Sequence, residues 1–179
     1  MIPLTTVQLL ALLSLLSVAV ATDLRERRIP NKVTVSGLVA GLIIAAIMEV
    51  GFPLMALAGA CVALLFSFPL VALGAIGAGD AKLLTAVGAF VGPGGILSVL
   101  IYGAIAGGVL ALISAIQTKT LLTTVSNSGK LFLNLITLGR HGARIGLNSP
   151  GVHAVPYGLA IAAGALATWF FPFSLGGSL

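Results

Sequence analysis

Long stretches of this chain contain no charged residue, and this feature limits what the chain can fold into. Residues 1–22, 50–79 and 83–118 have no Asp, Glu, Lys or Arg. A helix needs about 20 apolar residues to cross a bilayer core, so each stretch is long enough to do so. Over the whole sequence 7% of the residues are charged, whereas soluble domains carry about 25%. The sequence therefore predicts an all-α, multi-pass membrane helix bundle and excludes a water-soluble fold.

Six apolar segments, bounded by charges or by proline and glycine, are the expected transmembrane spans: 3–22, 33–50, 54–76, 81–92, 96–116 and 154–171. The fourth would cover only about 18 Å as a helix, so we expect a short or broken span beside a cavity. Irregular backbone at membrane depth persists only where protein or water covers it. A candidate site is therefore expected near residues 77–82.

Two further segments need separate treatment. Residues 19–21 imitate a signal-peptidase site, but no Lys or Arg precedes the apolar run, so we predict a retained first helix and a single membrane domain over residues 1–179. Residues 117–153 are expected to be a cytoplasmic segment, either a helix lying in the membrane interface or a surface linker.

The basic residues indicate the orientation of the chain. If the spans alternate in direction, the connections at 23–32, 77–82 and 117–153 lie on one side. They contain all nine basic residues: Arg25, Arg27, Arg28, Lys32, Lys82, Lys119, Lys130, Arg140 and Arg144. The positive-inside rule makes that side cytoplasmic and both termini external. Topology thus explains the net charge of +5, and we expect no nucleic-acid partner.

Metal and disulfide chemistry have little basis in this sequence. The chain has one cysteine, Cys61, so neither an intrachain disulfide nor a cysteine zinc site can form. We expect Cys61 to be a small buried apolar residue. His141 and His153 belong to no cluster of ligands, and we expect neither a metal nor another cofactor.

Of the four acidic residues, two are candidates for chemistry. Glu26 lies among arginines and Glu49 near the outer end of the second span, so interfacial structural roles are expected for both. Asp23 follows the first span and Asp80 opens the short fourth one, both on the cytoplasmic side. Carboxylates so close to a membrane usually face a partner or water. The best candidate chemistry is a carboxylate pair in which one group activates water and the other protonates the substrate.

The surroundings of the two aspartates suggest different roles. Asp80 is expected at the positive end of a helix dipole and Asp23 at a negative end, which favours Asp80 as base and Asp23 as acid. Gly77 and Gly79 would let the chain turn sharply and let a substrate backbone approach. Two glycines at this spacing also occur by chance among 23, and a helix cap followed by a turn is the alternative.

Two segments together resemble a known family. Residues 23–31 (DLRERRIPN) and 77–83 (GAGDAKL) resemble the two aspartate motifs of type IV prepilin peptidases, which are membrane aspartyl proteases of the G-x-G-D type. Residues 156–158 (PYG) resemble a late motif of the same family. The length of the chain and this ending resemble the compact branch that serves tight-adherence (Flp-type) pili.

The resemblance implies an aspartyl endopeptidase in the cytoplasmic membrane. It would cleave the leader peptide of a prepilin or pseudopilin after a glycine at the cytoplasmic face, in type IV pilus assembly or secretion, with Asp23 and Asp80 as the catalytic pair and no cofactor. The residues expected to bind substrate or shape the site are Gly77, Gly79, Lys82, Pro30, Asn31, Pro156 and Tyr157. Larger family members also N-methylate the new terminus and carry paired CxxC motifs, which this sequence lacks, so methylation is not expected.

Three alternatives stay open at this point. An archaeal preflagellin peptidase would share the same core. A small proton-coupled transporter would use Asp23 and Asp80 as a proton relay. A non-catalytic assembly scaffold would tolerate the loss of either aspartate.

Overall fold

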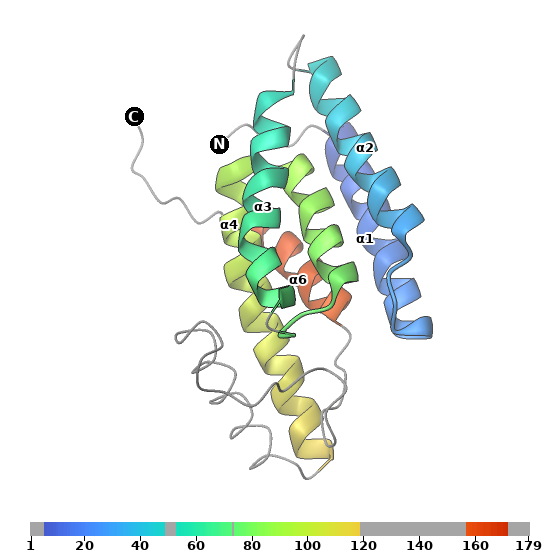
Figure 1. Ribbon diagram of the computed structural model, residues 1–179, viewed down its shortest axis with the longest axis vertical. Helices are drawn as coiled ribbons and strands as arrows, with labels where there is room; N and C mark the ends of the chain where they lie inside the picture. The colour runs from blue at the N-terminus through green and yellow to red at the C-terminus, as the bar shows by residue number, and fades with distance from the viewer. Residues whose placement is uncertain (1–5, 49–52, 73, 119–156, 172–179) are drawn as a thin grey trace.

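The protein is a bundle of helices (Figure 1). The computed structural model describes residues 6–48, 53–72, 74–118 and 157–171. This part of the chain forms five helices and no strand: α1 (Thr6–Glu26), α2 (Asn31–Met48), α3 (Leu54–Ala72), α4 (Ala78–Gln117) and α6 (Tyr157–Phe170). The first four are long and apolar enough to cross a membrane, and α6 is shorter but also apolar. The predicted all-α, multi-pass membrane fold is therefore confirmed.

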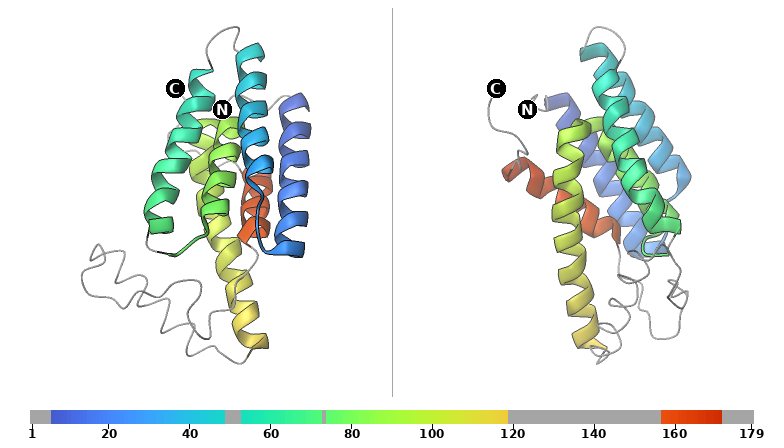
Figure 2. Two further views of the ribbon diagram at one scale, coloured as in Figure 1. Left: turned by 45° about the vertical axis from the view of Figure 1, so that its right-hand side comes forward. Right: turned by 60° about the vertical axis from the view of Figure 1, so that its left-hand side comes forward.

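Helix α4 contains a sharp turn at Gly92. Gly92 has φ 70° and ψ −180°, a left-handed backbone conformation that glycine adopts without steric cost. The next residue is Pro93, which has no backbone N–H to continue a helical ladder. The two halves of α4 therefore run in opposite directions, as Figure 2 shows. The predicted spans 81–92 and 96–116 correspond to these halves, and the second half returns to the end of the bundle where α4 begins.

Helix α3 ends four residues earlier than its predicted span. Gly74 adopts φ 72°, and the N–H groups of Gly74 and Ala75 bond to the carbonyls of Val71 and Leu70. These bonds satisfy carbonyl groups left free at a helix C-terminus. The early end leaves residues 74–77 to form the turn that leads into α4.

Small residues form the inner faces of α2 and α3. The buried residues of α2 are Thr34, Gly37, Gly41 and Ala45, and those of α3 are Ala56, Gly59, Ala60, Ala63 and Ser67. Large apolar side chains such as Leu65 and Phe68 point outward, where they are more than half exposed. This arrangement suits a bilayer, because lipid accepts apolar side chains while small residues let helices approach closely.

Glycine contacts hold α4 against its neighbours. A Cβ added to Gly88 would collide with the backbone of Gly59 on α3, and a Cβ on Gly164 of α6 would lie 2.6 Å from the backbone nitrogen of Gly103. A Cβ on Gly107 would lie 3.0 Å from the Tyr157 ring. Gly103 and Gly107 thus both lie at contacts with α6, and α4 packs between α3 and α6.

The basic residues in the part of the chain that the structure describes lie at one end of the bundle. Arg25, Arg27 and Arg28 lie at the end of α1 and in the connection to α2, whereas Lys32 and Lys82 lie in the first turns of α2 and α4. These helix ends lie together in Figures 1 and 2. This agrees with the predicted grouping of charge.

Several sequence predictions fall outside the described residues. These are the segment 119–156, including Pro156, His141, His153 and four basic residues, and Glu49. The expectation for Cys61 is wrong, since its side chain is exposed on α3 and not buried. On a membrane-spanning helix an apolar or weakly polar side chain can face lipid without cost, so hydropathy alone did not reveal its position.

Candidate active site

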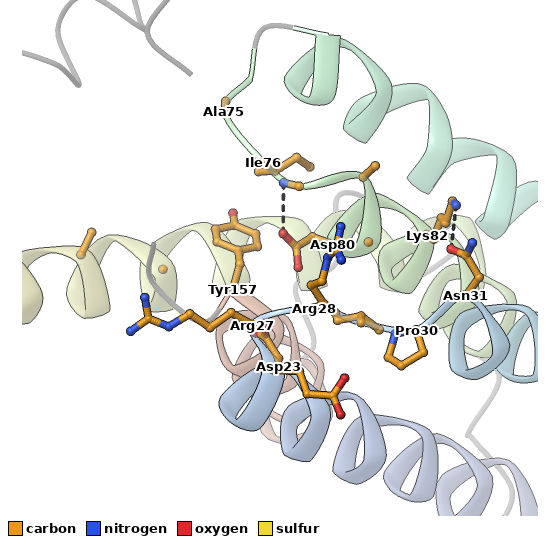
Figure 3. Close-up of a pocket in the computed structure, with 17 residues that line it drawn as sticks. Asp23, Arg27, Arg28, Pro30, Asn31, Ala75, Ile76, Asp80, Lys82 and Tyr157 are labelled. Atoms are coloured by element: carbon orange, nitrogen blue, oxygen red, sulfur yellow. Dashed lines mark hydrogen bonds between the residues drawn. The ribbon is translucent and has the colours of Figure 1, made fainter. Parts of the chain in front are cut away.

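A cavity of about 800 Å³ opens at the charged end of the bundle. Its walls come from the last turn of α1, the α1–α2 connection and the turn before α4. Further along the chain, Gly107 and Ala111 of α4 and Tyr157 of α6 complete it. Asp23 and Asp80 both line this cavity, as Figure 3 shows. The fold thus brings to one place two carboxylates that are separated in sequence by α2 and α3.

Asp23 is held by the beginning of α6. Its side chain is 6% exposed, and Oδ2 accepts a hydrogen bond of 2.8 Å from the backbone N–H of Gly158. A Cβ on Gly158 would lie 2.9 Å from the same oxygen and 3.2 Å from Cβ of Asp23. The absence of a side chain at residue 158 therefore allows the carboxylate to reach the free N–H groups of a helix N-terminus.

Asp80 is held by the turn that precedes α4. It is the third residue of α4, and its Oδ2 accepts a hydrogen bond of 3.1 Å from the backbone N–H of Gly77. A Cβ on Gly77 would lie 2.9 Å from that oxygen. The helix cap considered as an alternative in the sequence is therefore present. It does not remove Asp80 from the cavity, because the residue remains half-buried in the cavity wall.

Asp80 was expected at the positive end of a helix dipole and Asp23 at a negative end, but the structure does not show this difference. Asp23 does lie in the last turn of α1, but its Oδ2 also accepts the N–H at the start of α6. Each carboxylate thus meets the positive end of one helix dipole. The helix ends give no basis for assigning the base and the acid, and that assignment stays a prediction.

Comparison of the sequence with profiles of protein families identifies the family of this chain. The profile of the type IV leader peptidase family matches residues 10–112, which is more than half of the chain and includes Asp23 and Asp80. The chain belongs to the type IV leader peptidase family. Membership implies, in general terms, a membrane peptidase of the aspartic type. A search of curated proteins and a search of solved structures each return no match to the chain.

Of the remaining predicted site residues, those that the structure describes also line the cavity, whereas Pro156 lies outside the described residues. Lys82 Nζ donates a hydrogen bond of 2.8 Å to Asn31 Oδ1, which joins the first turn of α4 to the first turn of α2. The carbonyl of Pro30 accepts the N–H groups of Val33 and Thr34 and so starts α2. Lys82, Asn31 and Pro30 all line the cavity. The contact between Lys82 and Asn31 links the two segments that carry the family resemblance.

The two glycines of the G-x-G-D segment have different surroundings. Gly77 has no room for a Cβ beside Asp80, as described above. A Cβ on Gly79 would meet Ile29 at 3.5 Å or more, which is ordinary van der Waals contact. We therefore assign the stricter steric requirement to Gly77. Tyr157 also lines the cavity, although it lies beyond the residues that the family profile matches, and its role in the site stays a prediction.

Sequence reasoning missed several wall residues of the peptidase. Glu26, Arg27 and Arg28 line the cavity, although Glu26 was expected to have a structural role at the interface. Arg27 has φ 50°, a left-handed conformation that is uncommon for a residue with a side chain. Gly107 and Ala111 also line the cavity, although neither was among the predicted site residues, because no sequence pattern shows which face of a membrane helix borders a cavity. Among the described residues no group of three or more His, Cys, Asp or Glu forms a metal site.

Proposed function

We propose that this peptidase cleaves the leader peptide of a type IV or Flp-type prepilin or pseudopilin, with Asp23 and Asp80 as its catalytic residues. The observation that carries the proposal is the position of both carboxylates on one cavity. They come from α1 and α4, which are separated in the chain by two membrane spans. The family match supports a leader peptidase, and the motif resemblance supports this choice of substrate and residues.

The proposed reaction needs only the two carboxylates and water. One aspartate, ionised, takes a proton from a water molecule as the water oxygen attacks the scissile carbonyl carbon. The carbonyl oxygen becomes the negatively charged oxygen of a tetrahedral intermediate. The other aspartate, protonated, gives its proton to the amide nitrogen as the C–N bond breaks. The products are a leader with a free carboxyl group and a mature protein with a free amino group.

The location of the cavity supports cleavage at the cytoplasmic surface. The described basic residues lie at the same end of the bundle as the cavity, and the positive-inside rule assigns such an end to the cytoplasm. A substrate whose leader precedes an apolar helix would reach this end with its helix in the bilayer. We accordingly propose an enzyme of the cytoplasmic membrane that cuts after a glycine at the inner face.

Asp23→Asn and Asp80→Asn test the proposal. Each variant would be produced with a tagged prepilin, and processing would be followed by the mobility of the pilin on a gel and by sequencing of its new N-terminus. We expect both variants to lose processing, because the amide can neither accept the proton of water nor donate one as a carboxylic acid does. Glu49→Gln makes the corresponding change from acid to amide at an acidic residue outside the proposed catalytic pair, and should process normally.

Processing of the prepilin by either aspartate variant at the wild-type rate would rule out the proposed catalytic pair. Cleavage of a preflagellin and not of a prepilin would favour the archaeal-type alternative. The transporter alternative has less support, because a relay across the bilayer would need ionisable groups along the spans. In residues 6–48, 53–72, 74–118 and 157–171, the spans have no Asp, Glu, His, Lys or Arg between their ends.

A further inference from the structure

The first residue of α6, Tyr157, occupies a defined place in the cavity wall. Its side chain is half-buried, and its ring packs on Gly107, where an added Cβ would lie 3.0 Å from Cε2. The next residue, Gly158, donates its backbone N–H to Asp23. The start of α6 is thus held by the second half of α4 on one side and by α1 on the other. This double attachment fixes the direction in which the phenol enters the cavity.

The hydroxyl of Tyr157 has no hydrogen-bond partner in the described part of the chain. Figure 3 shows the Tyr157 ring on the Asp80 side of the cavity. The other tyrosine differs, because Tyr102 Oη donates a hydrogen bond of 2.9 Å to the backbone carbonyl of Phe171. A buried tyrosine hydroxyl usually finds a partner. Tyr157 lines the cavity, so its side chain can meet a substrate that binds there.

The reaction proposed above assigns no hydrogen-bond donor to the oxygen of the scissile carbonyl. That oxygen gains negative charge as water adds to the carbon, while one aspartate receives the proton of water and the other holds the proton that later goes to the amide nitrogen. A neutral donor in a site shielded from water stabilises this charge. The tyrosine hydroxyl is such a donor at neutral pH. It lies on the same cavity as Asp23 and Asp80.

We propose that the Tyr157 hydroxyl donates a hydrogen bond to the carbonyl oxygen of the scissile peptide bond and stabilises its negative charge in the transition state. The inference rests on the proposed peptidase function. Tyr157 transfers no proton in this scheme: the water proton goes to one aspartate, and the amide nitrogen receives its proton from the other. The hydrogen bond strengthens as charge develops on the oxygen, so it accelerates the chemical step more than it favours substrate binding.

Tyr157→Phe in the purified full-length protein tests this role. Cleavage of a synthetic prepilin peptide would be measured over a range of substrate concentrations in detergent or in proteoliposomes. We expect kcat to fall by about 10²-fold to 10³-fold, as for the removal of one such donor from other enzymes. KM should stay within about threefold, which is the pattern of an interaction made only in the transition state. Tyr102→Phe removes a hydroxyl away from the cavity and should leave kcat unchanged.

The other outcomes of this measurement contradict the proposal. A kcat for Tyr157→Phe close to the wild-type value means that the hydroxyl does not act in the chemical step. A rise in KM with unchanged kcat means that it binds the ground state equally well. A melting temperature lowered well beyond that of Tyr102→Phe means that the hydroxyl has a structural partner. Loss of cleavage in both aspartate variants alongside normal cleavage by Tyr157→Phe would overturn this inference and leave the proposed function intact.

A second pair of variants tests the position of the hydroxyl while keeping it present. Gly107→Ala places a methyl group 3.0 Å from the Tyr157 ring and 3.6 Å from Cβ of Ala160, so the ring must move. Gly108→Ala makes the same change at a residue with nothing within 4 Å. Because displacements of about 1 Å can cost about 10²-fold in rate, we expect kcat of Gly107→Ala to fall at least tenfold and that of Gly108→Ala to be unchanged. Equal kcat values for the two variants would contradict the proposal.

Discussion

The contact between Gly158 and Asp23 gives the sharpest prediction about the organisation of the site. In Gly158→Ala the new Cβ would lie 2.9 Å from Oδ2, 3.2 Å from Cβ and 3.3 Å from Cγ of Asp23. Carbon atoms in good contact are about 3.5–4.0 Å apart. The aspartate side chain must therefore move by several tenths of an ångström. That movement weakens or breaks the 2.8 Å hydrogen bond to the backbone N–H of residue 158.

The expected loss of stability in Gly158→Ala is small because two effects oppose each other. Overpacking a close contact costs about 1–3 kcal/mol, whereas alanine is favoured over glycine in a helix by about 0.8–1.0 kcal/mol. The net loss is then at most about 2 kcal/mol, which is a modest shift in melting temperature. The loss of activity should be larger, because a catalytic group displaced by about 1 Å can cost about 10²-fold in rate. We expect at least a tenfold fall in the rate of leader cleavage.

The assay combines thermal unfolding in detergent with the initial rate of prepilin cleavage. Gly108→Ala is the matched control, since it adds the same methyl group to a helix where nothing lies within 4 Å. It should keep its cleavage rate and melt at the same or a higher temperature. Wild-type cleavage by Gly158→Ala would refute the reasoning, because it would show that the position of Asp23 against α6 does not matter for the reaction.

Two further predictions concern the scaffold. Gly88→Ala should prevent stable folding, because its Cβ would collide with the backbone of α3, whereas Gly94→Ala has open space around it and should fold normally. The yield of monodisperse protein and the melting temperature distinguish the two variants. A well-folded Gly88→Ala would contradict the described helix contact. The hydrogen bond between Lys82 and Asn31 is exposed, so we expect it to contribute only a modest free energy of unfolding. A double-mutant cycle with Lys82→Met and Asn31→Ala should give a coupling free energy of about 0.5–1.5 kcal/mol. A coupling of zero would mean that the bond does not join α2 and α4 in solution.

Hydropathy predicted the positions of the helices well, because each apolar stretch is interrupted by charge, proline or glycine. The predicted span 33–50 corresponds to Asn31–Met48, and the short segment before residue 93 is the first half of α4. The same property could not show which face of a helix is buried. In a bilayer both the inner face and the lipid face are apolar, so side-chain size separates them and hydropathy does not. This is why the exposure of Cys61 was not foreseen.

The aspartates could be found from the sequence, but their surroundings could not. Asp80 follows two glycines in a recognisable segment, and Asp23 is the first charged residue after a long apolar run. The partner of Asp23 is Gly158, which lies 135 residues further along the chain. The partner of the Tyr157 ring is Gly107, which reaches the cavity only because α4 reverses at Gly92. Such contacts depend on the packing of whole helices, for which no short pattern in the sequence exists.

The turn at Gly92 also bears on how the chain enters the membrane during synthesis. The first half of α4, from Ala78 to residue 91, is about 21 Å long, which is shorter than the roughly 30 Å of a bilayer core. It also carries Asp80 in its first turn, a residue whose insertion into lipid is unfavourable. We therefore expect the translocation machinery to admit the two halves together, as one helical hairpin. The glycine that closes the hairpin would then be needed before any substrate is met, when the newly made chain acquires its topology.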